Sequence, residues 1–473
     1  MNPLQINDEN YRALAQRVVG LSCEYLGALP QLRTFPQITG TSVRDALAGA
    51  LPEKGQGAVA LDALAEVLRL SRPPSPRFFG YVLGSGEPVA ALGDYLASVL
   101  NQNLTAWRSA PAAVTLERQT IESLAAALHC PGLRGSFCGG GSLANLMGLA
   151  MAREAHVPAN AQGASPGVVY ASTEVHMSIP KAMALLGLGR EQLHLVPVDQ
   201  DFRMDVAQLE QAIAADRAAG RRPFAVVASS GTVNTGSIDP LPEIAAVCRA
   251  QGLWLHVDGA YGALAALAVP ERFAGLNEAD SLSLDPHKWL YQPLDCGLLL
   301  YRDAAAARRA FSFSGEYVRP LAEDPVEAFA FFDESLELSR RFRALKLWLS
   351  LNYHGLEAFR CAIREDLKHA QQLAHHVRLS ERLELCAPVS LSAVCFRHRP
   401  VPGAGDADAF NAAVLRRVLE RGRIYLSNAT LGGAFMLRAC FVNHRTTDED
   451  VAQVVPEVLA AADEVQASGR PQR

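Results

Sequence analysis

The middle of the chain alternates short, mostly apolar runs with longer stretches whose apolar residues recur every three or four positions. The apolar runs cover residues 168–170, 193–198, 224–228 and 253–257. Helical periodicity lies between them, at residues 178–186, 205–219 and 241–251. Strands that alternate with helices predict an α/β fold with a largely parallel sheet covered on both faces. Because ligands of such sheets bind beyond the carboxyl ends of the strands, we expect the chemistry there.

Helical patterns also precede this region. From residue 8 to about residue 70, prolines and glycines interrupt a pattern whose apolar positions include Tyr11, Leu14, Val18, Leu21 and Tyr25. Such an arm cannot bury its apolar face alone, so we expect it to pack on another body, as an appendage or as a dimer arm. A further helix is predicted at residues 114–128.

The C-terminal part of the chain predicts a small α+β region. Residues 338–348 open a long helix. Beyond it we expect a strand at 394–397, a helix at 406–421, two strands around Gly432 and Gly433, and a final helix from 447 to about 465. The chain is therefore expected to have three parts, which are a helical N-terminal arm (1–85), a large α/β domain (86–355) and a small α+β domain (356–473).

Composition narrows the possible partners. A formal net charge of −5 and an isoelectric point near 6.2 argue against nucleic acid or an anionic membrane and favour a small molecule. The nine cysteines show no spacing typical of a metal site, and their odd number favours reduced thiols in the cytoplasm. The chain does not open on a basic segment followed by an apolar run, and its apolar stretches are short, so we expect neither a signal peptide nor a membrane span.

A glycine-rich turn precedes the first apolar run. Gly139, Gly140 and Gly141 lead into Ser142, and helical periodicity begins at once and continues to Arg153. Backbone N–H groups with no Cβ in the way, at the positive end of a helix dipole, can surround a phosphate. The spacing matches neither the dinucleotide fingerprint nor the P-loop, and a turn without a ligand is the alternative at this point.

Lys288 follows a short apolar run and the turn Asp285-Pro-His. A lysine held away from bulk water can lose its proton near neutral pH and become the nucleophile of Schiff-base chemistry, although a solvated surface lysine is the common alternative. Asp258 follows the run at 253–257, where it either caps the next helix or holds a protonated heterocyclic nitrogen. A lysine, an acid and a phosphate cradle together describe a pyridoxal-phosphate site.

Four segments, in the same order along the chain, resemble the group II pyridoxal-phosphate amino-acid decarboxylases, which include the aromatic-L-amino-acid decarboxylases. They are Gly-Gly-Ser-Leu-Ala-Asn at 140–145, His-Met-Ser-Ile-Pro-Lys at 176–181, Leu-His-Val-Asp-Gly-Ala-Tyr at 255–261 and Ser-Leu-Asp-Pro-His-Lys-Trp-Leu at 283–290. The resemblance runs from about residue 75 to about residue 450. It implies fold type I, that of aspartate aminotransferase, for a large cofactor-binding domain, and a homodimer with active sites at the subunit interface.

The resemblance also implies roles for individual residues. Lys288 would form the imine with the aldehyde of the cofactor, Asp258 would pair with its pyridine nitrogen, and His176 would stack on the face of its ring. The other residues expected to bind the cofactor are Gly141 and Ser142 at the phosphate, with His287 nearby, Thr232 and Ala260 at the ring, and Asp285. We expect no metal.

The implied reaction is decarboxylation of an L-amino acid to the amine and carbon dioxide, through a Lys288 aldimine and a quinonoid. In the family, a tyrosine on a mobile loop is implicated in protonating Cα afterwards, and residues 313–320 resemble that loop and place Tyr317 there. Family members with Phe at this position tend to form aldehydes, so Tyr317 favours simple decarboxylation. The alternative is another reaction on the same scaffold, by an aldehyde synthase, an aminotransferase or a carbon–carbon lyase.

Six residues are expected at the substrate pocket, and they are Tyr81, Val82, Asn103, Thr105, Leu294 and Leu338. Tyr81 and Leu338 match the aromatic decarboxylases, whereas the other four replace apolar or aromatic side chains of those enzymes. Fewer aromatic walls and the polar Asn103 make an aromatic amino acid only the leading member of a broad list of substrates. Arg438 resembles a substrate-contacting arginine of glutamate decarboxylases, with a structural ion pair as the open alternative.

Overall fold

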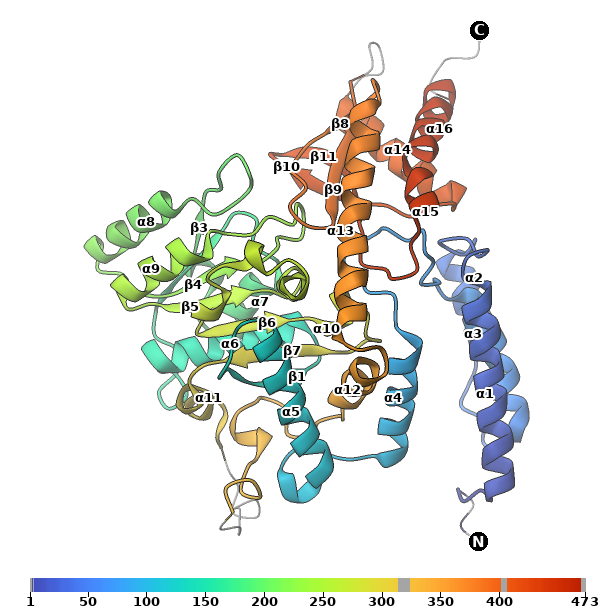
Figure 1. Ribbon diagram of the computed structural model, residues 1–473, viewed down its shortest axis with the longest axis horizontal. Helices are drawn as coiled ribbons and strands as arrows, with labels where there is room; N and C mark the ends of the chain where they lie inside the picture. Colours follow the sequence, from blue (N-terminus) through green and yellow to red (C-terminus); the bar gives the residue numbers. More distant parts are fainter. Residues whose placement is uncertain (1, 3, 314–323, 401–405, 469–473) are drawn as a thin grey trace.

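The computed structural model describes residue 2 and residues 4–313, 324–400 and 406–468 of the 473-residue chain. Within these residues, seven strands form a central sheet in the order β1-β7-β6-β5-β4-β2-β3 (Figure 1). Strand β7 is antiparallel to both β1 and β6, and the other neighbouring strands are parallel. The predicted α/β fold with a mostly parallel sheet is confirmed. The strands are β1 (Arg134–Cys138), β2 (Val168–Ser172), β3 (Leu193–Val196), β4 (Pro223–Ser229), β5 (Trp254–Asp258), β6 (Ser281–Leu284) and β7 (Gly297–Tyr301).

Helices cover both faces of this sheet. Strands β2, β5 and β7 are buried at every position, and because successive side chains point to opposite faces, such strands need cover on both sides. One face packs against α5 (Pro111–Ala127), α8 (Val206–Ala218), α9 (Leu241–Gln251) and α12 (Ala344–His354). The other face packs against α6 (Gly141–His156), α7 (Ser178–Leu185) and α11 (Ala304–Phe311).

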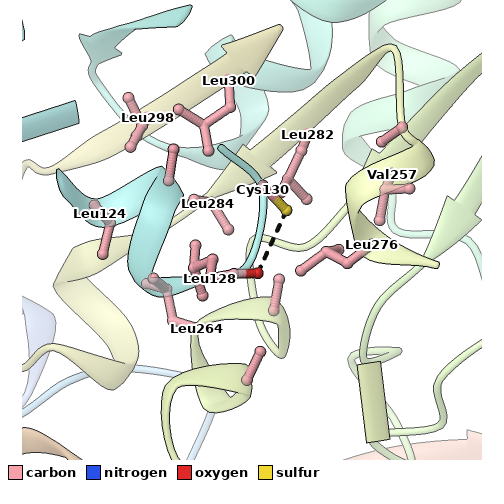
Figure 2. Close-up of a cluster of buried hydrophobic side chains, with 14 of the residues drawn as sticks. Leu124, Leu128, Cys130, Val257, Leu264, Leu276, Leu282, Leu284, Leu298 and Leu300 are labelled. Carbon is pink, nitrogen blue, oxygen red and sulfur yellow. Dashed lines mark hydrogen bonds between the residues drawn. The ribbon is translucent and has the colours of Figure 1, made fainter. Parts of the chain in front are cut away.

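Figure 2 shows part of the first face, where leucines from α5 and its C-terminal end meet the leucines of β6 and β7. Leu124 and Leu128 lie in the same buried cluster as Leu282 and Leu298. The Cys130 thiol donates a hydrogen bond to the Leu128 carbonyl at 3.4 Å. Burial raises the pKa of Cys130 to about 11, so the thiol is neutral at physiological pH and packs as a small apolar side chain.

A second core belongs to the C-terminal region, where a four-stranded antiparallel sheet has the order β10-β11-β9-β8. Phe79, which lies far away in the sequence, is buried in this core and pairs with it through the backbone groups of Tyr425 and Cys440, each at 2.9 Å. Gly355, where the boundary between the large and small domains is expected, separates α12 from α13. The elements are α13 (Leu356–Leu379), β8 (Leu383–Leu385), β9 (Ala393–His398), α14 (Ala407–Arg421), β10 (Ser427–Leu431), β11 (Ala434–Cys440), α15 (Asp448–Ala452) and α16 (Val454–Ser468).

The N-terminal arm consists of helices that stand beside the body of the molecule (Figure 1). They are α1 (Asp8–Ala28), α2 (Gly40–Leu47) and α3 (Ala63–Leu70), and they precede α4 (Pro88–Leu100). Helix α1 has no buried residue, and the Tyr11 hydroxyl shares a hydrogen bond of 2.6 Å with the hydroxyl of Tyr95 on α4. None of the helices in the described ranges is long and apolar enough to span a membrane.

Two predicted helices differ from the structure. The helix expected from residue 338 begins only at Ala344, because the Arg340 backbone N–H donates to the Asn103 side-chain oxygen at 2.9 Å and the segment before Ala344 is held by tertiary contacts. The final helix is divided into α15 and α16 at Gln453. Pro456 lies in the first turn of α16, where a missing N–H costs no helical hydrogen bond, so it permits a new helix to start there.

A buried ion pair connects the segment before α12 to the central sheet. The side chains of Arg340 and Glu117, which is on α5, are fully buried and pair with each other. Glu117 Oε1 also accepts from the Phe137 N–H at 3.1 Å, and Arg340 donates to the carbonyls of Phe137 at 2.9 Å and Leu104 at 3.1 Å. The pair therefore connects α5, β1 and the segment around residue 104.

We predict that Glu117→Leu lowers the free energy of unfolding by about 3–5 kcal/mol, because it leaves the Arg340 cation buried without its carboxylate. Urea denaturation checks this. The double variant Glu117→Leu/Arg340→Met is the matched control and should lose less, since it removes both charges together. A single variant as stable as the wild type would contradict the prediction.

Candidate active site

A cavity of about 250 Å³ opens at the carboxyl ends of β1, β4, β5 and β6. Strands β1 and β6 point the same way because both are antiparallel to β7, so residues far apart in the sequence meet at one edge of the sheet. The cavity is lined by Gly139, Gly140, Gly141, Ser142, Asn145, Glu174, His176, Ser229, Gly231, Thr232, Val233, Asp258, Ala260, Tyr261, Asp285, His287, Lys288 and Leu294. All the residues that were expected to bind the cofactor therefore lie around one space.

Lys288 lies on the short helix α10 (Pro286–Trp289), directly after β6. Its side chain is 16% exposed, and its Nζ pairs with Asp285 Oδ2 at 2.9 Å. The neighbouring His287 donates a hydrogen bond from its Nδ1 to the Cys296 carbonyl at 2.8 Å, and burial lowers the pKa of His287. The lysine amine thus reaches the cavity from a turn that two polar contacts hold in place.

Asp258, the last residue of β5, is a buried carboxylate surrounded by donors. Its Oδ2 accepts from Asn145 Nδ2 at 2.9 Å, and its Oδ1 accepts from the Ser283 hydroxyl at 3.1 Å and the Ala260 N–H at 3.2 Å. Within the described ranges, no Lys, Arg or His side chain forms an ion pair with Asp258. Because a buried carboxylate is stabilised by a cationic partner, a protonated nitrogen heterocycle in the cavity suits this site.

His176 lies in the turn between β2 and α7. Its Nδ1 shares a hydrogen bond of 2.8 Å with the Ser178 hydroxyl and accepts the Ser178 N–H at 3.3 Å. Burial lowers the pKa of His176, so the imidazole is neutral at neutral pH. A neutral, flat ring held at a cavity wall can stack on a heterocycle.

The glycine turn forms the floor of the cavity where α6 begins. Gly140 has a φ of 130°, a conformation that L side chains rarely adopt. A Cβ on Gly141 would lie 2.6 Å from the Ala260 Cβ and 2.9 Å from Asp285 Oδ2. Asp285 Oδ1 is buried without a hydrogen-bond partner among the described residues. The open N–H groups of the first turn of α6 suit a phosphate.

Thr232 lies in the turn after β4 and is buried. Its Oγ1 shares a hydrogen bond of 2.8 Å with the Thr235 hydroxyl and accepts the Ser237 N–H at 3.2 Å. In the same turn, Asn234 Nδ2 donates to Oε2 of Glu174, which follows β2, at 3.0 Å. These contacts make the turn after β4 a fixed wall.

Unlike the residues expected to bind the cofactor, most of the six residues expected at the substrate pocket do not lie around the cavity. Leu294 lines the cavity, whereas Tyr81, Val82, Asn103, Thr105 and Leu338 do not. Tyr81, Leu294 and Leu338 are all more than half exposed. The Asn103 side-chain oxygen is engaged by the Arg340 N–H at 2.9 Å, which leaves it less free to select a polar substrate group. Tyr317 lies outside the described residues.

Arg438 is 2% exposed and is held by oxygen atoms that carry no formal charge. Its Nε donates to the Asn234 carbonyl at 3.2 Å, and its Nη1 donates to the Tyr81 carbonyl at 3.1 Å. The structural ion pair left open by the sequence is not seen among the described residues. Arg438 instead joins two segments at the active site, those of Tyr81 and Asn234.

Several polar residues of the site were not singled out from the sequence. Asn145 and Ser283 donate to Asp258, and Ser178 bonds to His176. All three lie within the four motif segments, and this position is the only feature of the sequence that points to them. Their function as hydrogen-bond partners could not be read from the sequence, because it depends on which elements meet in space.

The fold is that of a pyridoxal-phosphate enzyme of fold type I, and the cavity brings together a lysine, a buried carboxylate and a glycine turn, which suit the aldehyde, the ring nitrogen and the phosphate of that cofactor. The family model described as the pyridoxal-dependent decarboxylase conserved domain matches residues 64–399. The chain belongs to the pyridoxal-dependent decarboxylase family.

Individual relatives agree with this assignment. An aromatic-L-amino-acid decarboxylase of Bacillus atrophaeus is 34% identical over 474 aligned residues, which cover 98% of each chain. An L-2,4-diaminobutyrate decarboxylase of Rhizobium meliloti (strain 1021) is 32% identical over 88% of this chain and 84% of its own. A crystal structure of Oryza sativa TDC with PLP and tryptamine superposes with a TM-score of 0.92, at 28% identity, and covers 98% of this chain and 99% of its own. The expected cofactor and activity are confirmed, and the protein is a carboxy-lyase, a pyridoxal-phosphate-dependent amino-acid decarboxylase.

We predict that Gly141→Ala weakens pyridoxal-phosphate binding roughly fivefold to 150-fold, the range for an overpacking cost of about 1–3 kcal/mol. The added methyl group would press on Ala260 and Asp285. Gly139→Ala is the matched control, because a Cβ there meets only Asp295 Oδ2 at an ordinary 3.5 Å. Dissociation constants from fluorescence titration check the prediction, and equal losses in the two variants would contradict it.

Proposed function

We propose that this chain decarboxylates an L-amino acid with an aromatic side chain to the amine and carbon dioxide, as a cytoplasmic homodimer. The observation that carries the chemistry is the meeting of Lys288, Asp258, His176 and the glycine turn around one cavity. A decarboxylase needs those groups together, because the nucleophile, the ring acid and the phosphate site must hold a single small molecule in one orientation.

Each residue would have a distinct part. Lys288 would bind the carbonyl carbon of the cofactor, and the first turn of α6 with Ser142 would bind its phosphate. Asp258 would keep a proton on the ring nitrogen, because its carboxylate has donors around it and no cation of its own among the described residues. Pyridoxal phosphate supplies an electron-poor ring that stabilises the negative charge left at the substrate Cα when carbon dioxide leaves.

The chain's own residues would also orient the substrate. His176 would close one face of the ring, so that the substrate is handled from the other face. Arg438 fixes the segments of Tyr81 and Asn234, which border the site, and so would keep these walls in place. The bond that breaks must lie perpendicular to the ring, and rigid walls make that orientation reproducible. Tyr317 would return a proton to Cα, which favours the amine as product over an aldehyde.

An aromatic side chain is the best-supported substrate. Tyr81 lies in an aromatic group with Phe78 and Tyr425, with ring centroids 5.9 Å apart for Tyr81 and Tyr425. The Asn103 amide oxygen, which would otherwise favour a polar substrate, already accepts a backbone hydrogen bond. The similarity to an aromatic-L-amino-acid decarboxylase points the same way. A screen of all proteinogenic amino acids for amine product is the direct test of this choice.

The surface of a single chain supports a homodimer. Helix α4 exposes Leu92, Leu96 and Val99, which share one face, and α1 exposes Val18 and Val19. A row of exposed large apolar side chains on neighbouring helices is typical of an interface. A second copy suits it, because two-fold symmetry pairs the same patch on both subunits and would also cover Leu294, which lines the cavity.

The thiols are consistent with a reducing compartment. All nine cysteines are free in the structure, and burial raises the pKa of five of the buried ones, Cys130, Cys138, Cys248, Cys296 and Cys395. Free thiols in this number favour the cytoplasm, where disulfides are rarely maintained.

We predict that Lys288→Ala abolishes the visible absorbance of bound cofactor and lowers amine formation by roughly a thousandfold or more, as expected for loss of a nucleophile. Lys181→Ala is the control, because Lys181 belongs to a motif segment but is exposed on α7. Absorbance spectra and assays of carbon dioxide, amine and aldehyde check both variants. Visible absorbance that survives Lys288→Ala, or aldehyde as the main wild-type product, would contradict the proposal.

We predict that Leu96→Asp converts the dimer to a monomer with little activity, because it buries an unpaired charge in the proposed interface. Leu379→Asp, on α13, places the same charge at another exposed leucine and should leave the dimer intact. Sedimentation velocity of both variants is the measurement. A wild-type protein that sediments as an active monomer would exclude the dimer.

A further inference from the structure

Asn145 occupies a central place behind the cofactor site. It lies one turn into α6, is 1% exposed, and touches three side chains from two other elements, β5 and α7. Its Oδ1 shares a hydrogen bond of 2.9 Å with His256 Nε2 on β5. Its Nδ2 donates to Asp258 Oδ2 and to the Ser178 hydroxyl, each at 2.9 Å. All the hydrogen-bonding groups of the amide are therefore used inside the protein.

The hydrogen bond to His256 determines which way the Asn145 side-chain amide is oriented. Trp254 Nε1 donates to the Ser281 hydroxyl oxygen at 2.8 Å, so the single hydroxyl proton of Ser281 is free for His256 Nδ1, also at 2.8 Å. The other ring nitrogen of a neutral His256 then carries the proton and donates to Asn145 Oδ1. Burial lowers the pKa of His256 to about 4, which agrees with a neutral ring.

The backbone of α6 makes room for this contact. A Cβ on Gly148 would lie 2.6 Å from both Cε1 and Nδ1 of the His256 ring. The ring therefore packs directly against the helix one turn beyond Asn145. With the carbonyl oxygen of Asn145 turned toward His256, its NH₂ group faces the cofactor side.

The two N–H bonds of that NH₂ group diverge to two different site residues. One reaches Asp258, which contributes the carboxylate. The other reaches Ser178, whose hydroxyl can then donate its own proton to His176 Nδ1 at 2.8 Å. One amide thus touches the carboxylate directly and the imidazole through a single hydroxyl group.

We infer that Asn145 is a positioning residue. It fixes the positions of Asp258 and His176 relative to each other, so that both side chains contact the same bound ring. The inference rests on the proposed function of Asp258 and His176 at pyridoxal phosphate. Without Asn145, Asp258 loses one of its three donors, and Ser178 loses the contact that directs its hydroxyl toward His176. Both groups would then be free to shift.

The test is the dissociation constant of pyridoxal phosphate, measured on the full chain stripped of cofactor, together with the visible circular dichroism of the bound cofactor. Asn145→Ala should raise the dissociation constant roughly tenfold to a hundredfold, the range for lost hydrogen bonds to a charged group, and weaken the dichroic band. Leu149→Ala is the matched control, because Leu149 is fully buried on the same helix but packs in the apolar cluster. It should lower the melting temperature and leave cofactor binding near the wild-type value.

A double-mutant cycle separates positioning from general damage. In the Asp258→Asn background, Asn145→Ala should raise the dissociation constant by a clearly smaller factor, since the charged acceptor is gone. Effects that multiply independently, or an Asn145→Ala variant that binds like Leu149→Ala, would overturn the inference. Should Asn145→Ala fail to fold, Ser178→Ala removes one oxygen atom and should still raise the constant about threefold to tenfold. An unchanged constant in that variant would equally overturn it.

The wild-type chain and the Lys288→Ala variant, measured in the same experiment, test the proposed function separately from the inference about Asn145. A wild-type chain that binds no pyridoxal phosphate would remove the proposed function itself. A wild-type chain that binds it, a Lys288→Ala variant that loses the visible band and an Asn145→Ala variant that keeps wild-type binding would together reject only the inference about Asn145.

Discussion

A carboxylate buried at the end of a central strand is the constraint on which the active site depends. Asp258 is removed from water, and the described residues offer it donors but no cation. Three hydrogen bonds fix the positions of its two oxygens. These hydrogen bonds hold the carboxylate in the protein without a ligand, and a protonated ring nitrogen in the cavity would stabilise it further by charge attraction. The carboxylate is therefore prepared for a cationic heterocycle before any ligand binds.

The sheet order explains how this carboxylate meets its companions. The glycine turn follows β1, Asp258 ends β5 and Lys288 follows β6, and these strands share one direction although they are separated in the sequence. Strand β7 lies between β1 and β6 and runs the other way. Gly297, at the start of β7, lies so close to the glycine turn that a Cβ on it would overlap Gly140. The antiparallel strand thus sets the distance between the phosphate cradle and the lysine turn.

Much of this could be predicted from the sequence, for a physical reason. Strands β2, β4 and β5 are buried on both faces, so they appear as apolar runs, and the motif residues at their ends follow directly. Strand β1, with Arg134, Gly135 and Ser136, has no such run and was not predicted. The delayed start of α12 and the contacts of Asn145 depend on partners far away in the sequence, Asn103 in one case and His256 in the other. Local periodicity does not contain that information.

The cofactor site and the residues expected at the substrate pocket differ in burial, and this difference has a consequence for specificity. Lys288, Asp285 and His287 are largely buried within one chain and belong to one network of contacts. Tyr81, Leu294 and Leu338 are more than half exposed on that same chain, so a second subunit is the natural way to complete their surroundings. Substitutions at the exposed positions can then change which side chain is accepted without disturbing the ion pair of Lys288 or the donors of Asp258. The same cofactor chemistry can therefore serve different amino acids, with selection made at the surface where two subunits would meet.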